Sequence, residues 1–181
     1  MSKTNPYKKK RRQASTLILF FGEGFGEEMF LKHLKKIYSY NSGVAVTVRK
    51  GKGGCPENIV IDAIKVPGAF NKKIVLLDND KPGTEMSKAR QKAKEYNIDL
   101  IENTPCLEFL LLEILDGKPK EKASEKCKKE FESKYIEKQK RSDPNKYEEL
   151  FPKKLLDIKR LKIPELEKLI SIMEGKIINN I

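Results

Sequence analysis

Short apolar runs alternate with longer amphipathic segments along the first 115 residues of the chain. The apolar runs predict strands at 16–21, 44–48, 74–77 and 98–101. Apolar residues that recur at helical spacing predict helices at 27–40, 56–66, 84–96 and 106–115. This alternation predicts an α/β fold, with a mainly parallel sheet, right-handed crossovers and helices on both faces of the sheet.

The pattern changes after residue 116, where strands give way to charged helical patterns. These patterns are broken at Asp143-Pro144-Asn145 and at Pro164. We therefore predict three parts. They are a basic flexible arm (1–14), an α/β domain (15–116) and a small, charged C-terminal helical appendage (117–181).

Two carboxylates end the third predicted strand. Asp78 and Asp80 follow four apolar residues and precede a turn at Pro82-Gly83. Ligands of open α/β sheets bind at the carboxyl edge, and residues i and i+2 of a strand project alike. The two aspartates could therefore share one divalent cation. The alternative is that Asp78 caps the following helix and Asp80 lies in a solvated turn.

The net charge of +12 is concentrated at the two ends of the chain. Residues 1–12 hold six basic and no acidic side chains, residues 13–115 hold 14 and 13, and residues 116–181 hold 18 and 13. Basic flanks attract a polyanion by releasing its counterions, so nucleic acid is the leading candidate partner. For the C-terminal flank, a solvated lysine-rich surface is an equal alternative. The residues that we assign to a polyanion-binding arm are Lys8, Lys9, Lys10, Arg11 and Arg12.

Several classes of protein are disfavoured by the composition. No apolar run approaches the roughly 20 residues of a membrane span, so we expect a soluble, cytoplasmic protein without a membrane partner. Cys55, Cys106 and Cys127 are widely spaced, which predicts free thiols and neither a disulfide framework nor a zinc knuckle. His33 has no second histidine to complete a catalytic dyad, and its helical pattern predicts an ordinary surface position.

A loop rich in glycine follows the second predicted strand. Arg49, Lys50 and Lys52 lie in or beside it, where flexible backbone can approach a phosphate, so we assign them to substrate binding. A lysine-rich surface loop is the alternative. Neither 51–54 nor 22–26 matches the glycine spacing of an ATP or dinucleotide site, so we do not expect ATP or NAD to be used.

Acidic residues follow the ends of three predicted strands, namely Glu23 after the first, Asp78 and Asp80 after the third, and Glu108 after the fourth. This arrangement resembles the Toprim domain of topoisomerases, primases and related nucleases. Glu23-Gly24 matches the glutamate motif of that domain, and Asp78-x-Asp80-x-x-Gly83 matches its aspartate motif.

One branch, the RloB-like proteins of bacterial defence loci, resembles the chain more closely, over about residues 8–135. The matching features are the basic arm, Glu23-Gly24 with Glu27 or Glu28, the glycine loop 51–54, Asp78 to Asp80, and Asn103-Thr104-Pro105-Cys106-Leu107-Glu108 before a leucine-rich helix. The chain departs from the pattern at two places. Phe25-Gly26 stands where relatives usually carry polar or charged residues, and Thr104 interrupts an Asn-Pro pair.

The resemblance implies a Toprim-type nuclease that depends on Mg²⁺, with Mn²⁺ as an alternative cofactor. It implies that Asp78 and Asp80 bind the metal and that Glu23 binds metal or acts as general base. Glu108 would be a further ligand or would orient the others, unless it only caps backbone amides at a helix start. Strand ends that are neighbours in a parallel sheet lie about 5 Å apart, so we expect Glu23 and the two aspartates to converge.

The same resemblance implies a role in anti-phage defence or abortive infection, together with a separate ATPase subunit. It leaves DNA and RNA open as substrates and assigns no oligomeric state. Two other classes compete with the nuclease. One is a non-catalytic, degenerate Toprim module that binds nucleic acid or the ATPase. The other is a receiver-like phosphoacceptor domain. Against that class, the chain lacks a clear separate acceptor aspartate and a strand-end lysine in the expected order.

Overall fold

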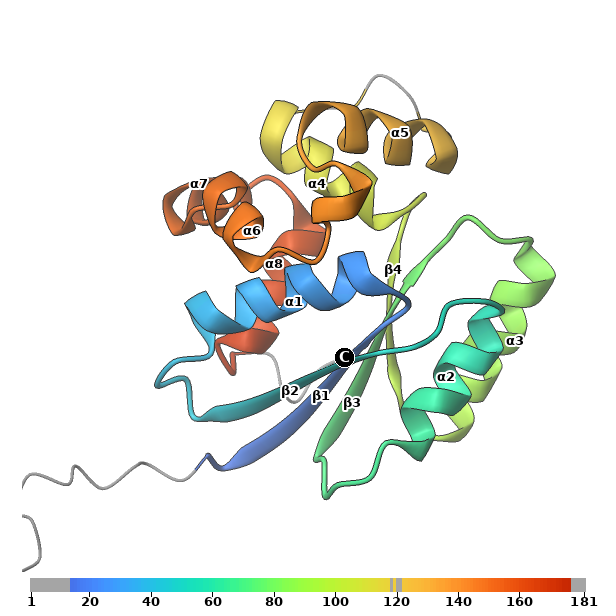
Figure 1. Ribbon diagram of the computed structural model, residues 1–181. Coiled ribbons are helices and arrows are strands. Elements are labelled where there is room, and N and C mark those ends of the chain that lie inside the picture. Colours follow the sequence, from blue (N-terminus) through green and yellow to red (C-terminus); the bar gives the residue numbers. More distant parts are fainter. Residues whose placement is uncertain (1–13, 118, 120–121, 177–181) are drawn as a thin grey trace, which may run out of the picture.

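A parallel four-stranded sheet with helices on both faces forms the centre of the structure, a computed structural model that describes residues 14–117, 119 and 122–176 (Figure 1). The strands are β1 (Thr16–Gly22), β2 (Val44–Lys50), β3 (Lys72–Asp78) and β4 (Asp99–Asn103), in the order β2-β1-β3-β4. The helices between them are α1 (Phe25–Tyr38), α2 (Pro56–Lys65) and α3 (Gly83–Glu95). The predicted α/β fold is thereby confirmed.

The later helices follow β4 without another strand among the described residues. They are α4 (Leu107–Asp116), α5 (Ser124–Lys134), the short 3₁₀ helix η1 (Lys138–Lys140), α6 (Pro144–Leu150), α7 (Lys153–Lys159) and α8 (Pro164–Met173).

Strand β3 shows why its apolar run is continuous. Ile74 and Leu76 belong to one apolar core, which also contains α1, whereas Val75 and Leu77 belong to a second core with α2 and α3. A strand that is covered on both faces has no position left for a polar side chain. Asp78 continues the phase of Leu76, so its side chain enters on the α1 side of the sheet.

The path of the chain through the sheet reverses between β1 and β3. From β1 the chain passes through α1 to β2, and it then returns through α2 to β3 on the other side of β1. Helix α1 covers one face of the sheet and α2 and α3 cover the other (Figure 1). The carboxyl ends of β1 and β3 therefore flank the topological switch point, where open α/β sheets bind their ligands.

The C-terminal helices share the core on the α1 face. Phe151 packs edge-on against Phe30 of α1, with ring centroids 5.5 Å apart, and Phe131, Tyr147 and Leu166 belong to the same apolar cluster. Helices α5 to α8 are thus continuous with the sheet domain through buried side chains. The domain boundary that we predict after residue 116 stays a prediction. The apolar core continues across this position without a break.

Two of the sequence predictions, on disulfide bonds and on membrane-spanning helices, concern features that the structure describes. No disulfide joins Cys55, Cys106 or Cys127, as predicted. Of the helices that the described residues form, none combines the length and the apolar character required to cross a membrane.

His33 is buried, so the prediction of a surface position is wrong. Its side chain is 7% exposed, and Nε2 lies 2.8 Å from the carbonyl oxygen of Phe151, to which it donates. Residues 144–151 cover this face of α1, and the helical pattern of α1 alone gives no sign of that cover. Burial lowers the pKa of His33, while Glu148 and Lys36 face the ring with opposing effects on that pKa.

We expect the buried, neutral imidazole to make stability fall in mild acid. The pKa of His33 is lowered in the folded state, so the unfolded chain takes up this proton first as the pH falls below about 6.5. Wild type should then lose more free energy of unfolding than His33→Gln, which keeps a donor toward Phe151 and does not titrate. Urea unfolding of both proteins between about pH 7.5 and 5.5 measures the difference, and parallel stability curves would contradict the assignment.

Candidate functional site

Glu23 and Asp78 meet at the switch point. Gly22 lies opposite Leu76 in the register of β1 and β3, so each acid leaves the sheet at the same edge. The backbone N–H of Asp78 points to Oε2 of Glu23 at 3.4 Å. Burial, together with the charge of Asp78, raises the pKa of Glu23. The two side chains are therefore close enough to feel each other's charge.

Asp78 is held by two elements of the C-terminal half of the chain. Its side chain is buried, with Oδ1 accepting a hydrogen bond from the backbone N–H of Leu107 at 2.9 Å and Oδ2 lying 3.0 Å from Nζ of Lys128. Asp78 thus caps α4, and not α3, the helix that directly follows it. Burial raises the pKa of Asp78, and Lys128 opposes that rise.

Asp80 shares the same lysine. Its Oδ2 accepts a hydrogen bond from Ser124 Oγ at 2.8 Å and lies 3.4 Å from Lys128 Nζ. Burial alone would raise the pKa of Asp80, but Ser124 and the two neighbouring ammonium groups, Lys128 and Lys81, together lower it. Asp80 stays ionised in this arrangement, and its turn is tied to helix α5.

Lys128 is the site residue that the sequence analysis missed. Its ammonium bridges the two aspartates, and the charges of Asp78, Glu108 and Asp80 raise its pKa even though burial acts in the other direction. The spacing of Ser124 and Lys128 places both on one face of α5. Nothing in the sequence separates this lysine from its many neighbours, because the contact joins residues about 50 positions apart.

Glu27, and not Glu28, is the second acid of the glutamate motif that faces the site. Glu27 is 7% exposed and accepts a hydrogen bond from the backbone N–H of Gly24 at 2.9 Å. Burial first, and the charge of Asp78 second, raise the pKa of Glu27 to about 8. Glu28 instead pairs with Lys32, one turn along the helix.

Gly22 is required for this close approach of α1 to β1. A Cβ atom at position 22 would lie 2.4 Å from Cβ of Glu27, which no side chain can occupy. The glycine before Glu23 therefore allows the first turn of α1 to fold back over the strand end.

Glu108 lies in the first turn of α4 and faces the same acids. Its Oε2 is buried and has no hydrogen-bond partner among the described residues. Burial and the charge of Asp78 raise the pKa of Glu108, whereas Lys128 and Arg141 lower it. Glu108 is thus coupled electrostatically to Asp78, and its role as a ligand, as an orienting residue or as a cap stays a prediction.

The donor set of the site fits a hard divalent cation, while the arrangement of its side chains fits an ammonium group. Carboxylate oxygens from Glu23, Asp78 and Asp80 are the ligands that Mg²⁺ prefers in proteins. Over residues 14–117, 119 and 122–176, however, no three acidic, histidine or cysteine side chains are placed to hold a metal ion together. Lys128 holds the place between the aspartates, so a shared metal would require its ammonium to move.

Basic side chains lie at the same edge of the sheet. Lys50 is opposite Gly22 in the register of β2 and β1, and the loop after it stays close because Gly51 donates to the carbonyl of Gly22 at 2.9 Å. Arg49 is solvent-exposed beside Lys50, and Lys52 is exposed in the glycine loop. The basic residues predicted for the arm, Lys8, Lys9, Lys10, Arg11 and Arg12, lie outside the described residues.

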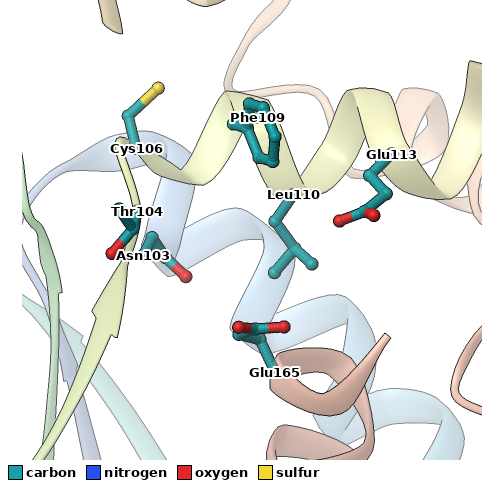
Figure 2. A pocket seen from close by; sticks show the side chains of 7 residues that line it. All are labelled: Asn103, Thr104, Cys106, Phe109, Leu110, Glu113 and Glu165. Atoms are coloured by element: carbon teal, nitrogen blue, oxygen red, sulfur yellow. The ribbon is translucent and has the colours of Figure 1, made fainter. Parts of the chain in front are cut away.

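A small cavity lies behind the end of β4, beside the acidic site (Figure 2). Its volume is about 50 Å³, enough for a water molecule and too small for a nucleotide. Asn103, opposite Asp78 in the register, is 2% exposed, and neither polar atom of its side chain has a partner in the described structure. In Figure 2, Asn103, Leu110 and Glu165 face this space, whereas Cys106 points away from it. The cavity is therefore a water-sized pocket of mixed lining and not the substrate site.

Comparison with known proteins assigns no family. No family model matches the chain, and no curated protein matches it. Among solved structures, the C-terminal region of the OLD protein from Xanthomonas campestris pv. campestris aligns with a TM-score of 0.31 at 11% identity, over 87% of this chain and 94% of that chain. That TM-score is too low to carry a functional inference, so the function has to be inferred from the site.

We expect removal of the Lys128 ammonium to destabilise the protein when no divalent cation is present. Lys128→Met leaves the buried Asp78 carboxylate without its counter-ion, a loss of about 1–3 kcal/mol after allowance for the partial exposure of the lysine. Urea unfolding in the presence of a chelator measures it. Lys129→Met, on the exposed face of the same helix, is the matched control.

The double variant Asp78→Asn/Lys128→Met separates an ion pair from a packing effect. If the ion pair is responsible, the double variant should recover part of the stability that the single variant loses. Equal stabilities of Lys128→Met and Lys129→Met would show that the bridge contributes nothing.

Proposed function

We propose that the protein is a Mg²⁺-dependent, Toprim-type nuclease that cleaves phosphodiester bonds of nucleic acid. One observation supports this above all others, namely that Asp78 and Asp80 hold a cationic group between them at the topological switch point. Glu23 and Glu108 add two carboxyl groups whose pKa values are raised by burial and by Asp78, so a cation bound nearby would favour their ionised forms. Mn²⁺ has similar ligand preferences and is expected to replace Mg²⁺.

Each side chain of the site has a part in this chemistry. Asp78 and Asp80 would hold the metal ion, and the chemistry that it would supply when bound is Lewis-acid activation of the scissile phosphate and of a water molecule. Glu23 accepts a proton from the attacking water more readily because burial and the charge of Asp78 raise its pKa. Lys128, once displaced from the carboxylates, would supply an ammonium group beside them that can neutralise charge developing on the phosphate.

The basic flanks and the carboxyl-edge cations supply affinity in this proposal. Arg49, Lys50 and Lys52 lie one strand away from Glu23, within reach of a backbone that crosses the sheet edge. The arm would add contacts to phosphates that carry no sequence information. The resemblance to RloB-like proteins adds a cytoplasmic role in anti-phage defence or abortive infection beside a separate ATPase subunit.

A non-catalytic module is the second candidate function, and the same lysine favours it. If Lys128 is a permanent counter-ion, the acidic site is a structural ion-pair network that needs no metal. The protein would then bind nucleic acid or the ATPase through its basic flanks.

Substitution of the aspartates separates the two candidates. We expect Asp78→Asn and Asp80→Asn each to reduce Mg²⁺-dependent cleavage by about 100-fold or more, because each loses a charged metal ligand. Binding of nucleic acid in the presence of a chelator should persist, and far-UV circular dichroism should show an unchanged fold. Asp62→Asn, an exposed acid on α2, is the control for the loss of one negative charge.

The outcomes are distinct. Cleavage at wild-type rates by either purified variant would rule out the proposed mechanism. Wild-type protein that binds nucleic acid and shows no cleavage with Mg²⁺ or Mn²⁺ would establish the non-catalytic module instead.

A separate prediction concerns the contribution of the N-terminal arm to nucleic-acid binding. Deletion of residues 1–12 removes six basic charges, so binding of nucleic acid should weaken and its dependence on salt should flatten. Each lost phosphate contact lowers the slope of log K against log salt by about one unit. Thermal stability should hardly change. An unchanged slope in fluorescence-anisotropy titrations at several salt concentrations would show that the arm does not contact nucleic acid.

A further inference from the structure

Phe25 is an exposed aromatic residue at the rim of the acidic site. It is the first residue of α1, two positions after Glu23, and 58% of it is accessible to solvent. It belongs to neither of the two apolar cores. An exposed phenylalanine gains little from folding, so packing does not explain its presence at this position.

The ring of Phe25 is paired with a cation. Nζ of Lys50 lies 3.9 Å from the centroid of the ring, and Lys50 is at the carboxyl end of β2, opposite Gly22. The glycine loop is open three and four residues beyond Lys50, since a Cβ atom at Gly53 or Gly54 would meet nothing within 4 Å. An aromatic face and an ammonium group are thereby presented together on an accessible surface beside Glu23.

These two groups match the two parts of a nucleotide. Base–aromatic stacking tolerates every base because each has a π face, and a lysine ammonium binds the adjoining phosphate. In a duplex the faces of the bases are covered by their neighbours, so only an unpaired nucleotide can stack on a protein side chain.

We propose that Phe25 and Lys50 form a stacking subsite for an unpaired nucleotide, which makes single-stranded nucleic acid the substrate class of the acidic site. The assignment of a substrate class rests on the proposed nuclease function. The stacking subsite itself rests on the geometry of the two side chains. A base on Phe25 places its phosphate beside Lys50, and the chain of the nucleic acid continues over the end of β1 toward Asp78 and Asp80.

A second cation–π pair provides a matched control. Nζ of Lys92 lies 5.4 Å from the ring centroid of Tyr96, which is 50% exposed. Tyr96 follows α3 and precedes β4, so it lies toward the opposite, amino edge of the parallel sheet. The pair resembles Phe25 and Lys50 in chemistry and differs from it in distance from the acids.

The absence of tryptophan from the chain allows a direct test. In Phe25→Trp the introduced indole is the single tryptophan of the full-length protein, and a stacked base quenches its fluorescence. The probes are oligo-dT and oligo-U of about twelve nucleotides and a DNA duplex of the same length, all titrated with a chelator present. We expect both single strands to quench Phe25→Trp, the duplex to leave it unchanged, and Tyr96→Trp to respond to none of them.

Affinity provides the second measurement. Phe25→Ala should bind the labelled single strands about 5- to 100-fold more weakly, as expected for the loss of one stacked base, and should bind the duplex as wild type does. Tyr96→Ala should leave both affinities unchanged. Circular dichroism and thermal unfolding of Phe25→Ala confirm that a loss of binding does not come from a loss of folding.

Three results would overturn the subsite. In the first, the fluorescence of Phe25→Trp is not quenched although anisotropy shows that the single strand is bound. In the second, Phe25→Ala loses single-strand and duplex affinity equally, and in the third, wild type binds none of the probes. The proposed nuclease function is tested separately by cleavage of the same oligonucleotides with Mg²⁺. Quenching without cleavage would support the stacking subsite and reject the nuclease function. Cleavage without quenching would support the nuclease function and reject the subsite.

Discussion

The burial of one carboxylate, Asp78, determines how the two halves of this protein are joined. A buried charge needs partners, and Asp78 finds them in the N-terminal amide of α4, through Leu107, and in the ammonium of Lys128 on α5. Both partners lie in the C-terminal half, so satisfying this charge at the end of β3 positions α4 and α5 over the sheet edge. The hydrophobic core on the α1 face, which includes residues of α4 to α8, stabilises the same arrangement.

The carboxyl groups around Asp78 resist ionising together. Burial and the charge of Asp78 raise the pKa values of Glu23, Glu27 and Glu108, so these groups hold their protons more readily, and Lys128 is the ammonium that bridges the two aspartates. Like charges that are held together by a fold cost stability unless a cation or a proton relieves them. Such a site gains stability from any additional cation that can enter, which is the physical reason for proposing metal-dependent chemistry there.

The sheet could be predicted from the sequence because its strands are buried on both faces, so that β3 appears as an uninterrupted apolar run between turn signals. The position of Asp78 followed from that run, since the first polar residue marks the strand end. Lys128 and the burial of His33 could not be predicted, because each depends on a contact between segments far apart in the chain. In a chain with 38 lysine and arginine residues, composition does not indicate which ammonium group faces inward.

Where the sequence departs from the resemblance, it acquires a property of its own. A polar residue at position 25 could not stack on a base, whereas an exposed phenylalanine beside Lys50 offers both stacking and charge. The edge of the sheet then presents, in the order β2, β1 and β3, an aromatic–cation pair, a glutamate and the two aspartates with their lysine. In the proposed function, a single strand that crosses this edge meets groups for its base, for its phosphate and for the bond to be cleaved in succession. A rigid duplex cannot make the first of these contacts without being opened.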